Sequence, residues 1–186
     1  MLAAFFLVFS SIALAQMGDK TQLITIILAT RTKKHPILFL SIMSGFAVGV
    51  SIAVIFGAGI ASIIPHTYIK VASGGIFVAL GTILFLNSTM VQTVNKKKHY
   101  QHHFLSTAFV ILLADFGDKT QIALALFSAT YHPFVVFAAG LLALGLDTFV
   151  VMYFSKRIAK HFNEKTIEKL ASVSFILVGV FLLLRS

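Results

Sequence analysis

The sequence Gln-Met-Gly-Asp-Lys-Thr-Gln at residues 16–22 recurs, with two changes, as Asp-Phe-Gly-Asp-Lys-Thr-Gln at residues 115–121. Each copy is followed by an apolar segment and then by a His-Pro pair, at 35–36 and at 132–133. The chain therefore contains an internal repeat, and the same charged motif lies at the corresponding place in each half.

The sequence around these motifs is strongly apolar. Of 186 residues, 58% are hydrophobic and 11% are charged, and the mean hydropathy is +0.95. Soluble domains are about 25% charged. The absence of cysteine excludes disulfides and thiolate metal sites. Apolar runs long enough to cross a bilayer predict six transmembrane spans, at about residues 1–30, 36–64, 69–94, 103–130, 133–155 and 168–185.

Basic residues predict the orientation of these spans. Eleven of the 15 Lys and Arg residues lie in the connections after the first, third and fifth spans: Arg31, Lys33, Lys34, Lys96, Lys97, Lys98, Lys156, Arg157, Lys160, Lys165 and Lys169. By the positive-inside rule these connections are cytoplasmic and both termini lie outside. The net charge of +9 then reflects loops beside an anionic leaflet, and we expect no nucleic-acid partner.

Each half contains three predicted spans, an odd number, so the second half must be inverted relative to the first. We predict an all-α membrane protein with a first repeat at residues 1–95, a basic cytoplasmic connection at 96–102 and a second, inverted repeat at 103–186. Inverted repeats with paired, glycine-interrupted segments are typical of transporters, with the binding site between the halves at mid-membrane.

Four of the six acidic residues, Asp19, Asp115, Asp118 and Asp147, fall within predicted spans. A charged side chain at the bilayer centre costs at least about 2.5–3.5 kcal/mol, so intramembrane acids indicate function. If the spans are continuous helices, residues three apart share a face. That spacing predicts two matching polar faces, Gln16-Asp19-Gln22 and Asp115-Asp118-Gln121.

Two such faces would offer carboxylate and amide oxygens, with the hydroxyls of Thr21 and Thr120 as further donors. Oxygen ligands suit hard divalent cations such as calcium, magnesium or manganese. Gly18 and Gly117 would let the helices loosen and expose backbone carbonyls. The alternative is that Asp19–Lys20 and Asp118–Lys119 are internal ion pairs that only hold the bundle together.

The repeated Gly-Asp-Lys-Thr motif in a chain of this plan resembles the Gdt-type family of manganese/calcium–proton exchangers. That family includes a Golgi member and bacterial manganese exporters, and its motif is Glu-x-Gly-Asp-(Lys/Arg)-(Thr/Ser) in each half. The resemblance implies an inverted-repeat fold in which the motif acids bind metal. The positions it carries over are Gln16, Asp19, Lys20 and Thr21, then Asp115, Asp118, Lys119 and Thr120.

The chain departs from the family motif at both leading acids. Gln16 replaces the first Glu, and its amide carries no charge. Asp115 replaces the second and is one methylene shorter. Related sequences tend to have an asparagine near position 147. We therefore interpret Asp147 as a ligand or proton carrier; the alternative is a polar contact within the helix bundle.

These observations predict a secondary active transporter, not an enzyme, that exports a divalent cation in exchange for protons, with Mn2+ as the first choice. No nucleotide-binding motif or cofactor is expected. The expected partners are the cation, protons and the lipid of a bacterial inner membrane. The predicted metal ligands are Gln16, Asp19, Asp115, Asp118 and Asp147, supported by Lys20, Thr21, Gln22, Lys119, Thr120 and Gln121.

Three other functions remain open at this point: Ca2+/H+ exchange, export of small organic solutes, and intramembrane aspartyl proteolysis. A lysine beside each motif aspartate opposes the shared-proton state that a protease needs. Among secondary features, we interpret His99, His102 and His103 as part of a solvated basic loop, and residues 155–168 as a short interfacial helix. The pairs Gly45/Gly49 and Gly74/Gly75 predict close helix packing.

Overall fold

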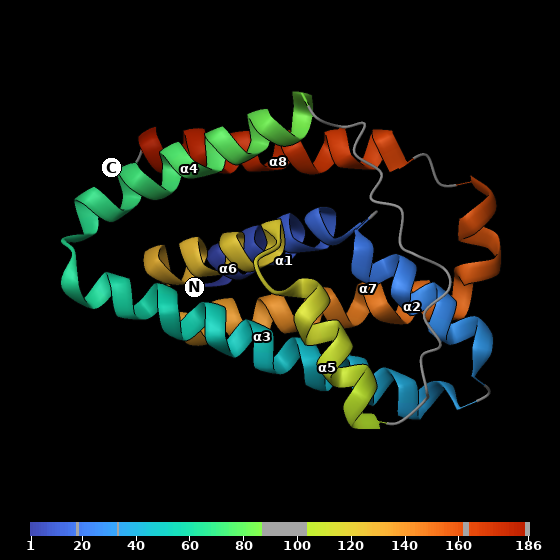
Figure 1. Cartoon of the computed structure of the whole chain (residues 1–186). Helices are drawn as coiled ribbons and strands as arrows, with labels where there is room; N and C mark the ends of the chain where they lie inside the picture. The colour runs from blue at the N-terminus through green and yellow to red at the C-terminus, as the bar shows by residue number, and fades with distance from the viewer. Residues whose placement is uncertain (18, 33, 87–103, 162–163, 185–186) are drawn as a thin grey trace.

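A computed structural model describes the chain except residues 18, 33, 87–103, 162–163 and 185–186 (Figure 1). The described residues form eight helices and no strand. The first half contains α1 (Leu2–Gln16), α2 (Lys20–Arg31), α3 (His35–Ile63) and α4 (His66–Leu86). The second half contains α5 (Phe104–Asp115), α6 (Lys119–Thr130), α7 (Pro133–His161) and α8 (Glu164–Leu184). The order of two short helices, a 29-residue helix and a 21-residue helix occurs twice.

The motif-bearing spans are interrupted. We expected one helix at each of residues 1–30 and 103–130, and this was wrong because the backbone leaves the helix at the motif. Asp19 has φ −84° and ψ 165°, and Asp118 has φ −81° and ψ 167°. In both breaks the aspartate amide donates to the carbonyl three residues earlier, at 3.2 Å. The repeated sequence thus produces a repeated backbone conformation.

Within the described part of the chain, two helical segments are long and apolar enough to cross a membrane, α3 and residues Pro133–Phe154 of α7. Shorter apolar helical segments lie at Leu2–Gln16, Val71–Ile83, Phe104–Asp115 and Ser172–Leu184. The predicted interfacial helix at 155–168 is wrong, because α7 continues to His161 and α8 already begins at Glu164. The predicted basic connection at 96–102, with His99 and His102, and the neighbouring His103 lie outside the described residues.

The two halves are interlocked. Helix α3 packs against α5 and α6 of the other half, while α7 packs against α1 and α2 (Figure 1). Helices α4 and α8 run side by side along one flank, and α3 also contacts α7. Each broken helix pair therefore lies against the long helix of the opposite half, which brings the two motifs together in the middle of the molecule.

Glycines permit these close contacts. A Cβ added at Gly45 would lie 2.5 Å from the carbonyl oxygen of Ala108 on α5, and one at Gly74 would lie 2.9 Å from the carbonyl oxygen of Gly179 on α8. Close packing was therefore predicted correctly for Gly45 and Gly74. Close packing was wrong for Gly75, where an added Cβ would meet nothing within 4 Å among the described residues.

Candidate metal site

Three carboxylates from the two motifs converge. One oxygen each from Asp19, Asp115 and Asp118 lies within 4.8 Å of the others. Asp115 and Asp19 are buried, at 1% and 6% exposed, and Asp118 is partly buried. Buried like charges repel one another and are retained where a cation or protons can neutralise them. The cluster is therefore a candidate site for a hard divalent cation, whose preferred ligands are oxygens.

The helix breaks position these carboxylates. Asp19 and Asp118 are the N-cap residues of α2 and α6, but neither side chain makes a capping hydrogen bond to its helix. The carboxylates are instead directed into the space between the halves. The N-termini of α2 and α6 lie next to these two aspartates, and the partial positive charge of a helix N-terminus stabilises anionic groups. Gly117, in the second break, has φ +77°, a conformation that favours glycine.

In the second half, neighbouring side chains hold Asp115 in place. Its Oδ2 accepts a hydrogen bond of 2.7 Å from Nε2 of Gln121, and its Oδ1 accepts one of 3.3 Å from Thr120. Within the described residues, Oδ2 of Asp118 is buried and accepts no hydrogen bond. Asp115 is thus oriented by two donors, while Asp118 retains a buried oxygen available to a cation.

The first half differs in its hydrogen bonds. Nε2 of Gln16 donates to the hydroxyl of Thr21 at 2.5 Å, and the other amide atom, Oε1, is buried without a hydrogen-bond partner among the described residues. Nε2 of Gln22 donates to Oδ1 of Asp147 on α7 at 2.7 Å. Gln16 is 1% exposed, so its carbonyl oxygen faces the protein interior.

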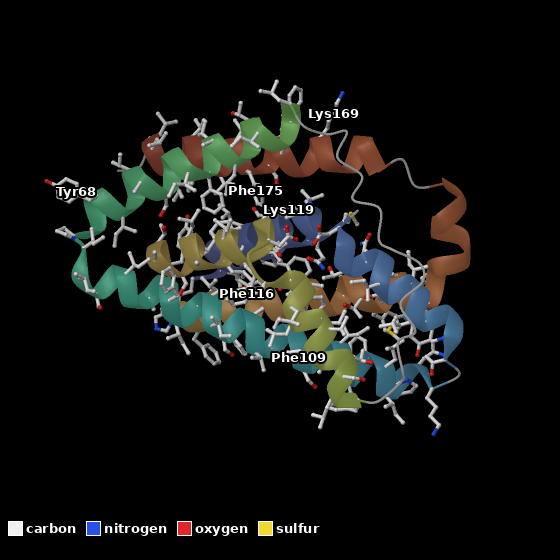
Figure 2. All side chains as sticks on the ribbon, in the orientation of Figure 1. Tyr68, Phe109, Phe116, Lys119, Lys169 and Phe175 are labelled. Atoms are coloured by element: carbon white, nitrogen blue, oxygen red, sulfur yellow. The ribbon has the colours of Figure 1, made fainter. Side chains whose placement is uncertain are left out.

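A lysine crosses between the halves. Nζ of Lys119, at the start of α6, lies 3.7 Å from Oδ1 of Asp19. The Lys119 side chain is 12% exposed and lies in the middle of the helix assembly, whereas Lys169 points outward (Figure 2). The described side chains thus place Lys119 with the aspartate of the other motif. The side chain of Lys20 lies outside the described part of the chain.

A cavity of about 640 Å³ lies beside the site. Apolar residues of α3, α4 and α6 form most of its wall, and it reaches Gly117 and Gln121 at the edge of the second motif. Tyr68, Ser73 and Gln121 are the residues in this lining that carry polar side-chain groups. The cavity therefore offers few oxygens to a hydrated cation, and the carboxylate cluster remains the candidate binding site.

The structure brings Asp19, Asp115 and Asp118 of the predicted site together. The reason is the break in each motif-bearing helix and not the shared helix face that the sequence predicts. Asp115 and Asp118 do not share the face of a continuous helix, because α5 ends at Asp115 and α6 begins at Lys119. Asp147 is not part of the three-carboxylate group. No pattern in the sequence pairs Gln22 with Asp147, because a single sequence offers little to connect residues 125 positions apart.

An all-helical, strongly apolar chain with a buried carboxylate cluster belongs to the class of membrane proteins that handle cations. The chain matches the family described as divalent cation/proton antiporter GDT1 over residues 4–92 and 103–186, and it belongs to this family. It is therefore an integral membrane transporter that exchanges divalent cations and protons, and it is not an enzyme. The alternative of an intramembrane aspartyl protease is thereby excluded.

Two relatives give the extent of the similarity. A GDT1-like protein of Synechocystis sp. is 24% identical over 200 aligned positions, which cover 97% of this chain and 96% of the relative. A Vibrio cholerae protein named "Putative manganese exporter" is 25% identical over 66% of this chain and 60% of its own length. No solved structure matches the chain.

Proposed function

We propose that this antiporter exports Mn2+ in exchange for protons and binds the cation between its two motifs. The observation that carries the proposal is the convergence of Asp19, Asp115 and Asp118 within 4.8 Å. The buried Oε1 of Gln16 would be a further ligand. Carboxylate and amide oxygens suit Mn2+, and they suit Ca2+ as well. The similarity to a protein named as a manganese exporter favours Mn2+.

The remaining motif residues act on these ligands. Thr120 and Gln121 orient the carboxylate of Asp115 through their hydrogen bonds. Lys119 contacts Asp19, so a metal ion that binds this carboxylate would have to displace the ammonium group. Thr21 orients Gln16 through a hydrogen bond, and Lys20 would be the counterpart of Lys119 by the internal repeat.

The proposed architecture is six spans in two inverted repeats, residues 1–95 and 103–186, joined by a basic cytoplasmic connection at 96–102. The same conformation at the two helix breaks and the exchange of partners between halves support this plan. The distribution of Lys and Arg supports external termini. Bacterial relatives support the inner membrane as its location.

The proposal is tested with purified protein in proteoliposomes that contain a fluorescent Mn2+ indicator. A proton gradient should drive Mn2+ against its concentration gradient, into the lumen when protons flow out and out of the lumen when protons flow in. Liposomes without protein should show no such movement. Parallel measurements with Ca2+, Mg2+ and a basic amino acid establish the substrate. Faster exchange of Ca2+ than of Mn2+ would overturn the choice of ion, and transport of the amino acid alone would overturn the proposed function.

A further inference from the structure

The two halves treat one repeated glutamine differently. Gln22 and Gln121 are the last residues of the two motifs, and each donates its Nε2 hydrogen bond to a carboxylate at 2.7 Å. The acceptor of Gln121 is Asp115, the first residue of its own motif. The acceptor of Gln22 is Asp147, which comes from the long helix α7. The donor and the distance are repeated, but the element that supplies the carboxylate is not.

The internal repeat explains why the acceptors differ. The first residue of the motif is acidic in the second half, Asp115, but neutral in the first half, Gln16. The long helices differ in the same sense: α3 of the first half has Gly49, whereas α7 of the second half has Asp147. Gly49 lies 13 residues after Pro36, and Asp147 lies 14 residues after Pro133. A Cβ added at Gly49 would lie 2.5 Å from Nε2 of Gln121, so this position faces its glutamine as Asp147 faces Gln22.

Each of the two glutamine amides therefore lies beside one carboxylate, and both carboxylates come from the second half. Gln121 has it at Asp115 of its own motif, and Gly49 of α3 leaves room for this amide. Gln22 has the neutral Gln16 at the corresponding motif position and takes its carboxylate from Asp147 on α7. Asp147 is 9% exposed and Gln16 is 1% exposed, so both positions are in the protein interior.

The formal charges of these sequence positions agree with this exchange. The two motifs and Asp147 together carry four carboxylates and two lysines, Lys20 and Lys119, a formal charge of two negative. One divalent cation neutralises that charge, as two protons would. Without Asp147 the interior would carry one excess positive charge when the cation is bound, and uncompensated charge in a low-dielectric interior is costly.

We infer that Asp147 supplies from α7 the negative charge that Gln16 lacks, and that it determines cation affinity without belonging to the three-carboxylate cluster. The inference rests on the proposed function, since it assigns a residue to the affinity of the same site. Gln22 is a positioning residue in this scheme: it holds Asp147 by its side chain, and its backbone amide donates to the carbonyl of Asp19 at 3.1 Å.

The test moves the charge from one position to the other. Asp147→Asn removes the charge but leaves an oxygen that can still accept the hydrogen bond from Gln22. Adding Gln16→Glu in the same chain restores four carboxylates. Mn2+ and Ca2+ binding is measured by calorimetry on each protein in lipid nanodiscs, and cation/proton exchange is measured in proteoliposomes. Thr148→Val is the matched control, because the Thr148 hydroxyl bonds only the carbonyl of Leu144 in its own helix among the contacts of the described residues.

Asp147→Asn should weaken cation binding by about 10–100-fold, the range seen when groups behind metal ligands are removed. The double variant should recover most of that affinity, and Thr148→Val should bind as the wild type does. Unchanged affinity in Asp147→Asn would overturn the inference. So would failure of a double variant that stays monodisperse in detergent to regain affinity. If that double variant does not fold, the double variant Gln22→Glu/Asp147→Asn replaces it, because Gln22→Glu returns a carboxylate to the same hydrogen bond. Failure of this second double variant to recover affinity would overturn the charge role of Asp147.

The wild-type measurements separate this inference from the proposed function. Wild-type protein that binds and exchanges Mn2+ supports the proposed function whatever the variants do. Wild-type protein that binds only Ca2+ overturns the choice of ion, and the affinities of the variants for Ca2+ then decide the role of Asp147. Wild-type protein that binds neither cation overturns both proposals.

Discussion

Nζ of Lys119, the first residue of α6, lies 3.7 Å from Oδ1 of Asp19, which precedes the first residue of α2. The two residues belong to different halves of the chain, so the ion pair joins the motifs across their interface. A metal ion bound to this carboxylate under the proposed function would have to displace the ammonium group. The proposed site would then be linked to the contact between the halves.

Lys119→Met should tighten Mn2+ binding by about tenfold or more, a change that corresponds to about 1.4 kcal/mol. The substitution removes the competing cation while keeping a long, unbranched side chain. Exchange should nevertheless slow, because the loaded site would then carry an excess negative charge through the membrane. Calorimetry in nanodiscs gives the affinity, and proteoliposome assays give the rate. Weaker binding in this variant would show that Lys119 orients Asp19 instead of competing for it.

The ligand assignment predicts that Asp19→Asn and Asp118→Asn each abolish transport while the protein stays folded. Each substitution keeps the size of the side chain and removes one charged oxygen from the cluster. Glu164→Gln is the control: it also removes one carboxylate, but from the basic sequence between the fifth and sixth predicted spans. Transport rates and size-exclusion profiles are compared for the three variants. Near-normal transport by either aspartate variant would refute the site.

The sequence identifies the three carboxylates that converge in the candidate site, but not their geometry. The repeat and the cost of intramembrane charge identified Asp19, Asp115 and Asp118, because those arguments hold for any helical arrangement. The expectation of a continuous helix failed, since the i, i+3 rule was applied across a position where the backbone is extended. The cross-half ion pair and the bond from Gln22 to Asp147 depend on tertiary packing, which has no local pattern in one sequence.

The predictions for the glycines also fail where the outcome depends on tertiary packing. Gly74 and Gly75 are adjacent and therefore lie on different sides of α4, yet composition alone treats them alike. Only Gly74 faces α8, where an added Cβ would lie 2.8 Å from Cγ of Leu183. Which glycine of a pair is a packing residue depends on the rotation of the helix about its axis, and that rotation is set by the neighbouring helices.

Two glycines of α3 provide a matched test of helix packing. A Cβ at Gly57 would collide with the carbonyl oxygen of Ala125 on α6, whereas a Cβ at Gly59 would meet nothing within 4 Å. Gly57→Ala should destabilise the protein by about 1–3 kcal/mol, as overpacking typically does. Gly59→Ala should be neutral or stabilising by up to about 1 kcal/mol, because alanine favours the helix. Thermal unfolding in detergent compares them, and equal midpoints would contradict the close contact between α3 and α6.

Gln16→Glu should tighten divalent binding and make it depend more steeply on pH. The new carboxylate replaces a neutral, buried amide oxygen of the first motif. It also adds a group for which metal ions and protons compete, since metal binding to ionisable ligands releases protons. Affinities measured at several pH values test this, with Thr148→Val as the reference. Identical affinities and pH profiles in variant and wild type would place position 16 outside the ligand set.

The last prediction is that exchange is close to electroneutral, with two protons returned for each divalent cation. Export of a divalent cation alone from a negative interior works against about 2.3 kcal/mol per charge per 100 mV, or about 4.6 kcal/mol for two charges. Return of two protons removes that cost. The formal charges of the two motifs and Asp147 in the sequence fit this ratio, since four carboxylates and two lysines leave two negative charges for either one cation or two protons.

Proteoliposomes loaded with a pH-sensitive dye, with the membrane potential clamped by potassium and valinomycin, measure this ratio. Addition of external Mn2+ should release protons from the lumen at a rate that changes little with the clamped potential. Entry of Mn2+ without movement of protons would refute the exchange mechanism. Proton movement that depends strongly on voltage would keep the exchanger but reject the two-for-one ratio. In Asp147→Asn the rate of proton release should depend more strongly on voltage than in the wild type, because the variant lacks one of the negative charges that the two protons neutralise.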